Sequence, residues 1–201
     1  YRNKRICFGE YASILSEREG KMDIIVMDDS YGLVYSKYFQ SLSPITQTKL
    51  KERQSVPNNV KDDIAFVPFR KDLGVLYYRK DLCDLYGLDC PPKTFVELEN
   101  LAYIIQKKKR KDNVFFEGWV WQGAKDETLS CIFYEWFVSS PSDGVYIIDG
   151  NMSINVNSNT TYAVLQRAKT WIGNISSTHM LGVNAEKTID VFASGNAAFA
   201  R

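Results

Sequence analysis

Short apolar runs recur along the first part of the chain and are separated by polar or charged residues. The run Asp23–Met27 predicts a buried parallel strand that ends next to carboxylates, because a parallel strand covered on both faces is apolar throughout. Two further runs, Ile64–Phe69 and Gly74–Tyr78, predict two more strands joined by a short charged segment. The first part of the chain therefore predicts a sheet.

Amphipathic stretches follow, with apolar residues three and four positions apart. Thr94 and Glu97 predict a capping box at the start of a helix. The apolar residues of this helix recur on one face: Leu98, Leu101, Ala102 and Ile105. The same spacing predicts a second helix over Glu127–Val138 with its apolar face inward.

Two more helices and two more strand regions are predicted towards the end of the chain. Thr161 is the expected N-cap of one helix, and a last helix covers Asn184–Ser194 with Gly195 just after it. Val114–Trp121 predicts a strand broken at Gly118. A β-hairpin is predicted to follow, with its turn at Asp149-Gly150. Since strands alternate with helices, the fold class is α/β.

Composition narrows the function only slightly. The chain has 201 residues and a formal net charge of +1, which favours neither nucleic acid nor an anionic membrane as a partner. The basic run Lys107–Lys111 would suit nucleic acid, but a solvated helix end explains it better, because cations are favoured at a helix C-terminus. No window has the roughly 20 apolar residues that cross a bilayer. Both ends read as cut, so we expect a piece of a longer chain.

The cysteines and the single histidine limit the chemistry. Gly87 can end a short helix and turn the chain back, so Cys83 and Cys90 form either a disulfide or a pair of reduced thiols. Cys131 is expected to be a small buried residue. With His179 as the only histidine, we expect neither histidine-based catalysis nor a histidine-rich metal site, and we expect no cofactor or metal.

Three sequons occur, at Asn151, Asn159 and Asn174. Chance explains part of this number, because the surrounding segment is rich in Asn, Ser and Thr. Together with the candidate disulfide, the sequons favour an oxidising extracellular or periplasmic setting.

Five segments occur in an order and spacing that are typical of one family. They are Asp23–Asp28, Val67–Leu82, Pro91–Leu98, Trp119–Gly123 with Glu127 and Glu135-Trp136 downstream, and Gly195–Phe199. On these segments, residues 20–201 resemble the extracellular solute-binding proteins of sugar ABC importers. The likeness is greatest to the trehalose/maltose-binding group.

The resemblance implies the two-lobed periplasmic-binding-protein fold (type II), in which two α/β lobes close on a sugar. Residues 1–74 would then be a partial first lobe and residues 75–196 a nearly complete second lobe. Residues 197–201 would begin the strand that returns to the first lobe. The first lobe would be incomplete, because the opening strand, helix and strand expected from the family are not recognisable in this sequence.

The resemblance also implies the residues that bind the ligand: Asp28, Tyr31, Phe69, Asp72, Trp121 and Glu127. Carboxylates suit sugar hydroxyls, since each accepts two hydrogen bonds, and flat aromatic rings suit the apolar faces of a sugar. Each residue also has a structural alternative. The carboxylates fit helix caps or solvated turns, and the aromatic residues fit a core. Tyr31 replaces the family's more usual Trp, and Asp126 and Thr128 also depart from its pattern, which leaves the identity of the sugar open.

The function implied is binding of an oligosaccharide, maltose-like or trehalose-like, by cleft closure, and delivery to a membrane permease. The chain has no Gly-x-Ser-x-Gly motif, no phosphate-binding loop and no Cys–His pair, so it is not expected to be an enzyme. One alternative is the extracellular ligand-sensing domain of a receptor, fused to a transmembrane region. Another is a degenerate relic that binds nothing.

Overall fold

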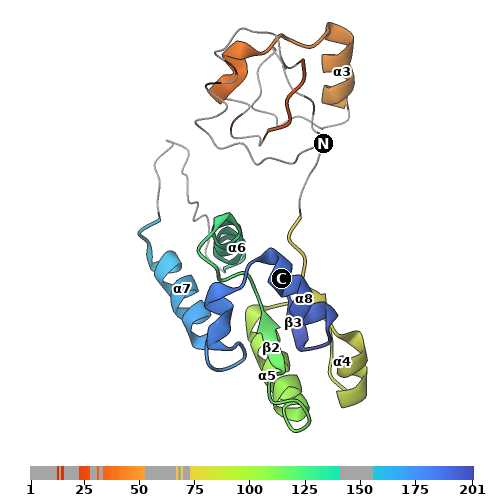
Figure 1. The fold of residues 1–201 in the computed structure, drawn as a ribbon, viewed down its shortest axis with the longest axis vertical. Helices are drawn as coiled ribbons and strands as arrows, with labels where there is room; N and C mark the ends of the chain where they lie inside the picture. The colour runs from red at the N-terminus through yellow and green to blue at the C-terminus, as the bar shows by residue number, and fades with distance from the viewer. Residues whose placement is uncertain are drawn as a thin grey trace. The chain divides into compact units, whose positions relative to one another are not determined.

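The computed structural model describes residues 34–52, 73–140 and 156–201, together with 13, 15, 23–27, 31, 67 and 69. The chain divides into two compact units, Tyr1–Asp72 and Leu73–Arg201. This division lies two residues before the boundary predicted between residues 74 and 75. Figure 1 shows both units as ribbons.

The regular elements described in the first unit are helical. A 3₁₀ turn, η1, covers Ser36–Tyr38, and helix α3 covers Pro44–Glu52. Helix α3 begins with Pro at its first position, where the missing N–H costs no helical hydrogen bond. The hydroxyl of Ser43 accepts a hydrogen bond from the backbone N–H of Thr46 at 3.4 Å and so caps the helix.

The predicted strands of the first unit are not found among its described residues. Asp23–Met27 forms no regular element, and the side chains of Ile24 and Val26 are 86% and 64% exposed. The prediction of a buried strand there was wrong, because a continuous apolar run is buried only where other layers cover it. Of Ile64–Phe69, only Val67 and Phe69 are described, and that predicted strand otherwise lies outside the described residues.

A three-stranded sheet organises the second unit. Its strands are β1 (Tyr77–Tyr78), β2 (Glu117–Val120) and β3 (Ala197–Ala200), in the order β1-β3-β2. The central strand β3 is antiparallel to β1 and parallel to β2. Residues 197–200, expected to begin the return to the first lobe, are thus the centre of this sheet. Only the last two residues of the run Gly74–Tyr78 are strand.

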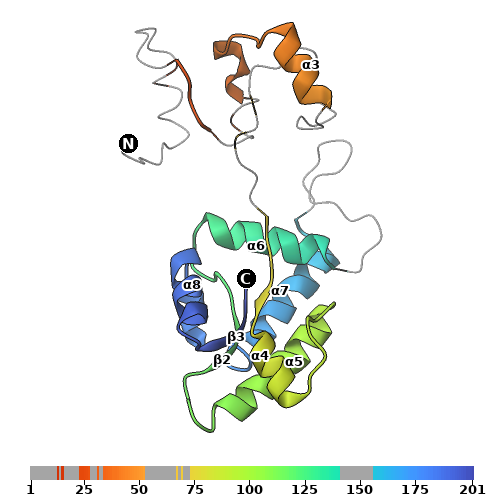
Figure 2. The same cartoon turned by 90° about the vertical axis from the view of Figure 1, so that its right-hand side faces the viewer.

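Helices surround this sheet. Helix α5 (Phe95–Lys109) lies on one side of β2 and β3, and α8 (Ala185–Ala193) lies on the other (Figure 2). The remaining elements of this unit are α4 (Lys80–Tyr86), α6 (Glu127–Val138), α7 (Asn159–Trp171) and the 3₁₀ turn η2 (Thr178–Gly182). Among these described elements, no helix is long and apolar enough to cross a membrane.

Most helix ends follow the sequence prediction. The Thr94 hydroxyl accepts from the N–H of Glu97, Asn184 caps α8, and Gly195 adopts a positive φ of 79° after α8. The start of α7 differs from the prediction. Ser158 is its N-cap, and its hydroxyl accepts from the N–H of Thr161, the residue expected to be the cap. The helix therefore starts at Asn159, because Ser158 and Thr161 are both suitable caps and Ser is preferred to Thr at this position.

Gly118 lies within β2 and does not break it. A Cβ atom at Gly118 would lie 2.7 Å from the carbonyl oxygen of Ala102 on α5. The N–H of Gly118 instead donates to Oε1 of buried Gln106 at 2.7 Å, and Nε2 of Gln106 donates to the carbonyl of Asn174 at 2.6 Å. Glycine here allows a helix to approach the sheet closely, so the predicted break was wrong.

All four tryptophans of the chain lie in the core of this unit and are 2–5% exposed: Trp119, Trp121, Trp136 and Trp171. The ring of Trp171 meets those of Trp119, Trp121 and Trp136 edge to face, with centroid distances of 6.2, 6.2 and 4.9 Å. Edge-to-face contact aligns the positive rim of one ring with the negative face of another. This tryptophan cluster joins β2 to α6 and α7.

Candidate functional site

The carboxyl ends of the parallel strands β2 and β3 mark the candidate site in the second unit. Ligands of open α/β sheets bind beyond these ends, where loops and helix N-termini converge. Strand β2 leads through residues 121–126 into α6, and β3 leads into Arg201. The two ends stay paired, because the N–H of Arg201 donates to the carbonyl of Val120 at 3.1 Å.

The loop after β2 is tightly packed. The N–H of Ala124 donates to the carbonyl of Val183 at 3.0 Å. A Cβ atom at Gly123 would collide with the backbone carbonyl of Met180. The side chain of Gln122 is 6% exposed, and its amide nitrogen donates to the carbonyl of Arg201. The loop is therefore held both by η2 and by the residue that follows β3.

Arg201 and Glu135 form a two-point ion pair at the same edge. Nε and one terminal nitrogen of Arg201 donate to the two carboxylate oxygens of Glu135, which lies on α6. The hydrogen bond that Arg201 donates to Glu135 raises the pKa of Arg201 above its ordinary value. Two parallel N–H···O bonds fix the guanidinium in orientation as well as in position. Nothing in the sequence pattern pointed to this pair, because 66 residues separate its members.

Glu127 lies in the first turn of α6, directly after this loop, and its side chain is exposed. The helix begins at Asp126, whose carboxylate accepts from the N–H of Thr128 at 2.8 Å. Because Asp126 provides the cap, Glu127 is not needed for that task. A carboxylate in the first turn also interacts favourably with the helix dipole. Glu127 therefore has no capping role, and its carboxylate is exposed.

The other expected ligand residues are placed differently. Trp121 is 3% exposed, and its ring N–H donates to the hydroxyl of Ser176 at 3.2 Å, so its faces are covered by the core. Phe69 is 83% exposed, and Tyr31 is half-buried in a helical stretch of the first unit. Asp28 and Asp72 lie outside the described residues. Of the expected ligand residues in the second unit, only Glu127 has an exposed side chain, in the first turn of α6.

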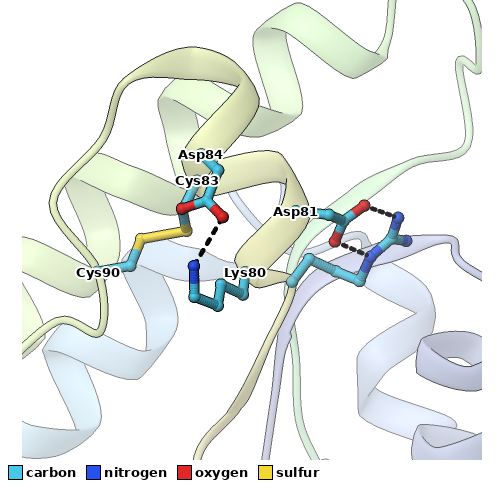
Figure 3. The surroundings of a disulfide bond; sticks show 6 residues. Lys80, Asp81, Cys83, Asp84 and Cys90 are labelled. Carbon is cyan, nitrogen blue, oxygen red and sulfur yellow. Dashed lines mark hydrogen bonds and ion pairs between the residues drawn. A yellow bond between two sulfur atoms is a disulfide. The ribbon is translucent and has the colours of Figure 1, made fainter.

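The disulfide predicted as one of two alternatives is present. Cys83 and Cys90 are bonded, with their Cα atoms 6.3 Å apart, and Gly87 turns the chain between them at a φ of 63° (Figure 3). On the same helix, Nζ of Lys80 lies 2.7 Å from Oδ2 of Asp84.

Arg79 and Asp81 form an ion pair at the start of α4. Arg79 donates to Asp81, and this hydrogen bond lowers the pKa of the Asp81 carboxyl.

Cys131 is a free and exposed cysteine, so the expectation that it is buried was wrong. It adjoins buried Ile132, but successive helical residues point about 100° apart, and only Ile132 faces the core.

The sequons and the basic run both lie on solvated surface where they are described. Asn159, the first residue of α7, and Asn174 are exposed, whereas Asn151 lies outside the described residues. Lys107–Lys109 form the last turn of α5, and Nζ of Lys108 lies 4.9 Å from the centroid of the Tyr86 ring. This placement suits a solvated helix end that packs on an aromatic ring.

The described residues hold no group of three or more His, Cys, Asp or Glu side chains that could bind a metal ion. A polar hollow of about 260 Å³ lies between α5 and the end of α7, away from the strand ends. It is lined by Glu99, Asn100, Tyr103, Thr170, Trp171, Asn174 and Ile175. The one carboxylate among these lining residues, Glu99, already accepts a hydrogen bond from the ring N–H of Trp171 at 2.7 Å and pairs with Arg167 at 3.2 Å. We therefore favour the strand ends as the site.

The chain resembles known proteins over nearly its whole length. Residues 9–201 match the family described as bacterial extracellular solute-binding protein. A probable ABC transporter-binding protein of Deinococcus radiodurans is 33% identical over 195 residues, which are 95% of this chain and 46% of that protein. The chain thus spans about half the length of this relative.

Two solved structures share the fold. Maltose-bound MalE3 of T. maritima is 30% identical with a TM-score of 0.53, over 63% of this chain and 31% of that chain. A solute-binding protein of an ABC transporter from Agrobacterium radiobacter K84, in complex with ribitol, is 22% identical with a TM-score of 0.52, over 62% of this chain and 29% of that chain. The second likeness bears on the fold alone.

The predicted fold class is confirmed by these structures, and the family is one of binding proteins rather than enzymes. With the match extending over residues 9–201, the chain belongs to the bacterial extracellular solute-binding proteins.

Proposed function

We propose that the protein binds a carbohydrate or polyol outside the cytoplasm and delivers it to the permease of an ABC importer. The observation that carries this proposal is the 30% identity to a maltose-bound protein of the same fold. The ribitol-bound protein has the same fold at lower identity. The Deinococcus relative, a probable ABC transporter-binding protein, favours a transport component over a receptor domain.

The chemistry at the strand ends suits such a ligand. Sugar hydroxyls need charged or amide groups that accept and donate hydrogen bonds at fixed positions. Glu127 offers an exposed carboxylate next to the loop that follows β2. That loop is held by a backbone hydrogen bond from Ala124 to Val183, the residue after η2, so a ligand would meet a preformed surface. We propose that Glu127 accepts hydrogen bonds from ligand hydroxyls.

The proposal extends to residues of the first unit on the family resemblance alone. Asp28 and Asp72 are proposed to accept hydrogen bonds from the ligand, and exposed Phe69 and half-buried Tyr31 are proposed to contact it. Trp121 is not included, because its ring is enclosed in the tryptophan cluster. A maltose-like or trehalose-like disaccharide is the proposed ligand, bound by closure of the two lobes of the complete protein.

The setting is proposed to be extracellular or periplasmic. The family is described as extracellular, and the Cys83–Cys90 disulfide is typical of proteins that fold under oxidising conditions. Exposed Asn159 and Asn174 are accessible to a glycosylating enzyme if the host cell has one.

Isothermal titration calorimetry of the complete protein tests the proposal. Maltose, trehalose and ribitol are titrated separately, with leucine as a solute of another class. We expect saturable binding of at least one of the three and none of leucine. Binding of leucine together with silence towards all three polyhydroxyl ligands would overturn the carbohydrate assignment.

A matched pair of variants tests the role of Glu127. Glu127 and Glu186 are both exposed glutamates in the first turn of a helix, on α6 and α8 respectively. Glu127→Gln should weaken binding by about tenfold, because a hydrogen bond to a charged group contributes roughly 1.5–3 kcal/mol. Glu186→Gln should leave affinity unchanged. Equal effects of the two substitutions would remove Glu127 from the site.

A further inference from the structure

Two segments of the second unit leave its sheet at one edge. Because β1 and β3 are antiparallel and Tyr77 pairs with Ala200, the residues before β1 and the residue after β3 lie side by side. The carboxyl end of β2 lies at the same edge, where the N–H of Arg201 donates to the carbonyl of Val120. All the residues concerned belong to the second unit, Leu73–Arg201.

Glu135 holds Arg201 at this edge from the third turn of α6. Its carboxylate accepts two hydrogen bonds from the guanidinium of Arg201. The side chains of Arg201 and Glu135 are 23% and 36% exposed, so water screens the pair only in part. Gln122 binds the carbonyl of Arg201 in addition. One residue after β3 is thus fixed by its N–H, its carbonyl and its side chain.

Gly74 fixes the other segment against the same pair. A Cβ atom at Gly74 would collide with the carboxylate of Glu135, and it would lie 2.8 Å from a terminal nitrogen of Arg201. The atoms that would have to move are therefore those of the ion pair. At Gly118 the obstructing atom is instead the backbone oxygen of Ala102. The missing side chain of Gly74 makes room for an ion pair, whereas that of Gly118 makes room for a helix.

We propose that Glu135 is a positioning residue, which clamps the segment before β1 and the residue after β3 together against α6. The clamp consists of Glu135, Arg201 and Gly74. It sets the direction in which both segments leave the sheet at the edge where the candidate ligand site lies. The effect that we expect of the clamp on ligand affinity rests on the proposed function. Its effect on the backbone of residues 74–78 and Arg201 does not.

Amide hydrogen exchange of the ligand-free complete protein tests the clamp first. Glu135→Ala and Gly74→Ala should each speed exchange at residues 74–78 and Arg201 by about three- to tenfold, as expected for loss of a partly exposed charged hydrogen-bond pair. Exchange on α4 should not change. Asp84→Asn, which breaks the ion pair with Lys80 on α4, is the matched control and should leave residues 74–78 unaffected.

The double variant Glu135→Ala, Gly74→Ala tests whether Glu135 and Gly74 act through the same contact. Removing the carboxylate of Glu135 empties the space that a Cβ at Gly74 would enter. Gly74→Ala should then add nothing to Glu135→Ala, whereas independent effects would add. If the two effects add, or if neither variant alters exchange, the clamp is overturned. Glu135→Ser, which also removes the carboxylate, provides the same test if Glu135→Ala does not fold.

Affinity for maltose separates this inference from the proposed function. If the wild type binds maltose, Glu135→Gln should raise Kd by about three- to tenfold without loss of thermal stability beyond that of Asp84→Asn. An unchanged Kd despite faster exchange would overturn the positioning role. If the wild type binds no sugar while the exchange effects appear and are non-additive, the clamp stands and the carbohydrate assignment falls.

Discussion

Two features of the second unit differ in how far apart in sequence their residues lie. One is the loop closed by the Cys83–Cys90 disulfide, and the other is the clamp of Glu135, Arg201 and Gly74. The loop joins residues seven positions apart in sequence, and its turn is made by one glycine with a positive φ. The ion pair of the clamp joins residues 66 positions apart. Only the loop has all its parts close together in sequence.

The separation in sequence bears on how each feature stabilises the protein. A local cross-link such as the disulfide stabilises the protein largely by restricting the conformations of the unfolded chain. Contacts between residues distant in sequence form only when the sheet has formed, so substitutions there test the tertiary structure. The tryptophan cluster and Gly118 belong to the second kind. The following substitutions test this division, in order of decreasing expected effect.

Trp136→Ala should destabilise the protein most. The ring is 5% exposed and lies 4.9 Å from Trp171 and 5.2 Å from Trp121, so its loss leaves a large cavity. Losses of this kind cost about 3–5 kcal/mol in free energy of unfolding. Urea denaturation followed by circular dichroism measures it. Tyr134→Ala, at a 53% exposed position of the same helix, is the control and should have little effect. Similar losses for the two variants would contradict the assignment of the core.

Gly118→Ala should have the next largest effect. The new methyl group would meet the backbone oxygen of Ala102, which cannot move without shifting α5 away from β2. Overpacking of this kind costs about 1–3 kcal/mol. Gly182→Ala is the matched control, because a Cβ atom there meets nothing within 4 Å. The same denaturation experiment compares them, and a fully stable Gly118→Ala variant would show that α5 does not pack this closely.

Removal of the disulfide should lower the free energy of unfolding by less than loss of the Trp136 ring does. Closing so short a loop contributes about 2 kcal/mol through the entropy of the unfolded chain. The double variant Cys83→Ala, Cys90→Ala should therefore lower the thermal midpoint, whereas Cys131→Ala should not, because that thiol is free and exposed. Differential scanning calorimetry without reductant compares the three proteins. Equal midpoints for the double variant and the wild type would mean that the loop is held by packing alone.

Lys80→Ala should have the smallest effect. Lys80 and Asp84 form an exposed ion pair one helical turn apart, and such pairs are screened by water and salt. The thermal midpoint should stay within experimental error at both low and high salt. A clear drop that disappears in high salt would show that the surface of α4 contributes more than local pairs usually do.

Much of the second unit was predictable from neighbouring residues. The start of α5 at Thr94, the extent of α6, the end of α8 before Gly195 and the turn at Gly87 all agree with the sequence prediction. Each rests on hydrogen bonds or backbone angles within a few residues. The start of α7 was missed even so, because Ser158 and Thr161 are both good caps and only one is used.

The candidate site was less predictable. Glu127 was identified through the family resemblance, and its exposure at the start of α6 is consistent with that role. Glu135 and Arg201 carry no local signal, since a glutamate on a helix and an arginine after a strand are ordinary surface residues. Trp121 was considered both as a stacking surface and as core, and only its contacts with Trp136 and Ser176 place it in the core.

The sequence by itself determined the α/β class, the helices of the second unit, the disulfide as one of two alternatives, and the family. These depend on spacing, capping and turn chemistry within short stretches, where few competing arrangements exist. The tertiary structure alone decided that Gly118 continues a strand, that β3 is the central strand, and that Glu135 meets Arg201 beside Gly74. Each of these depends on which distant segments pack together, and the free energy of that choice is spread over the whole core.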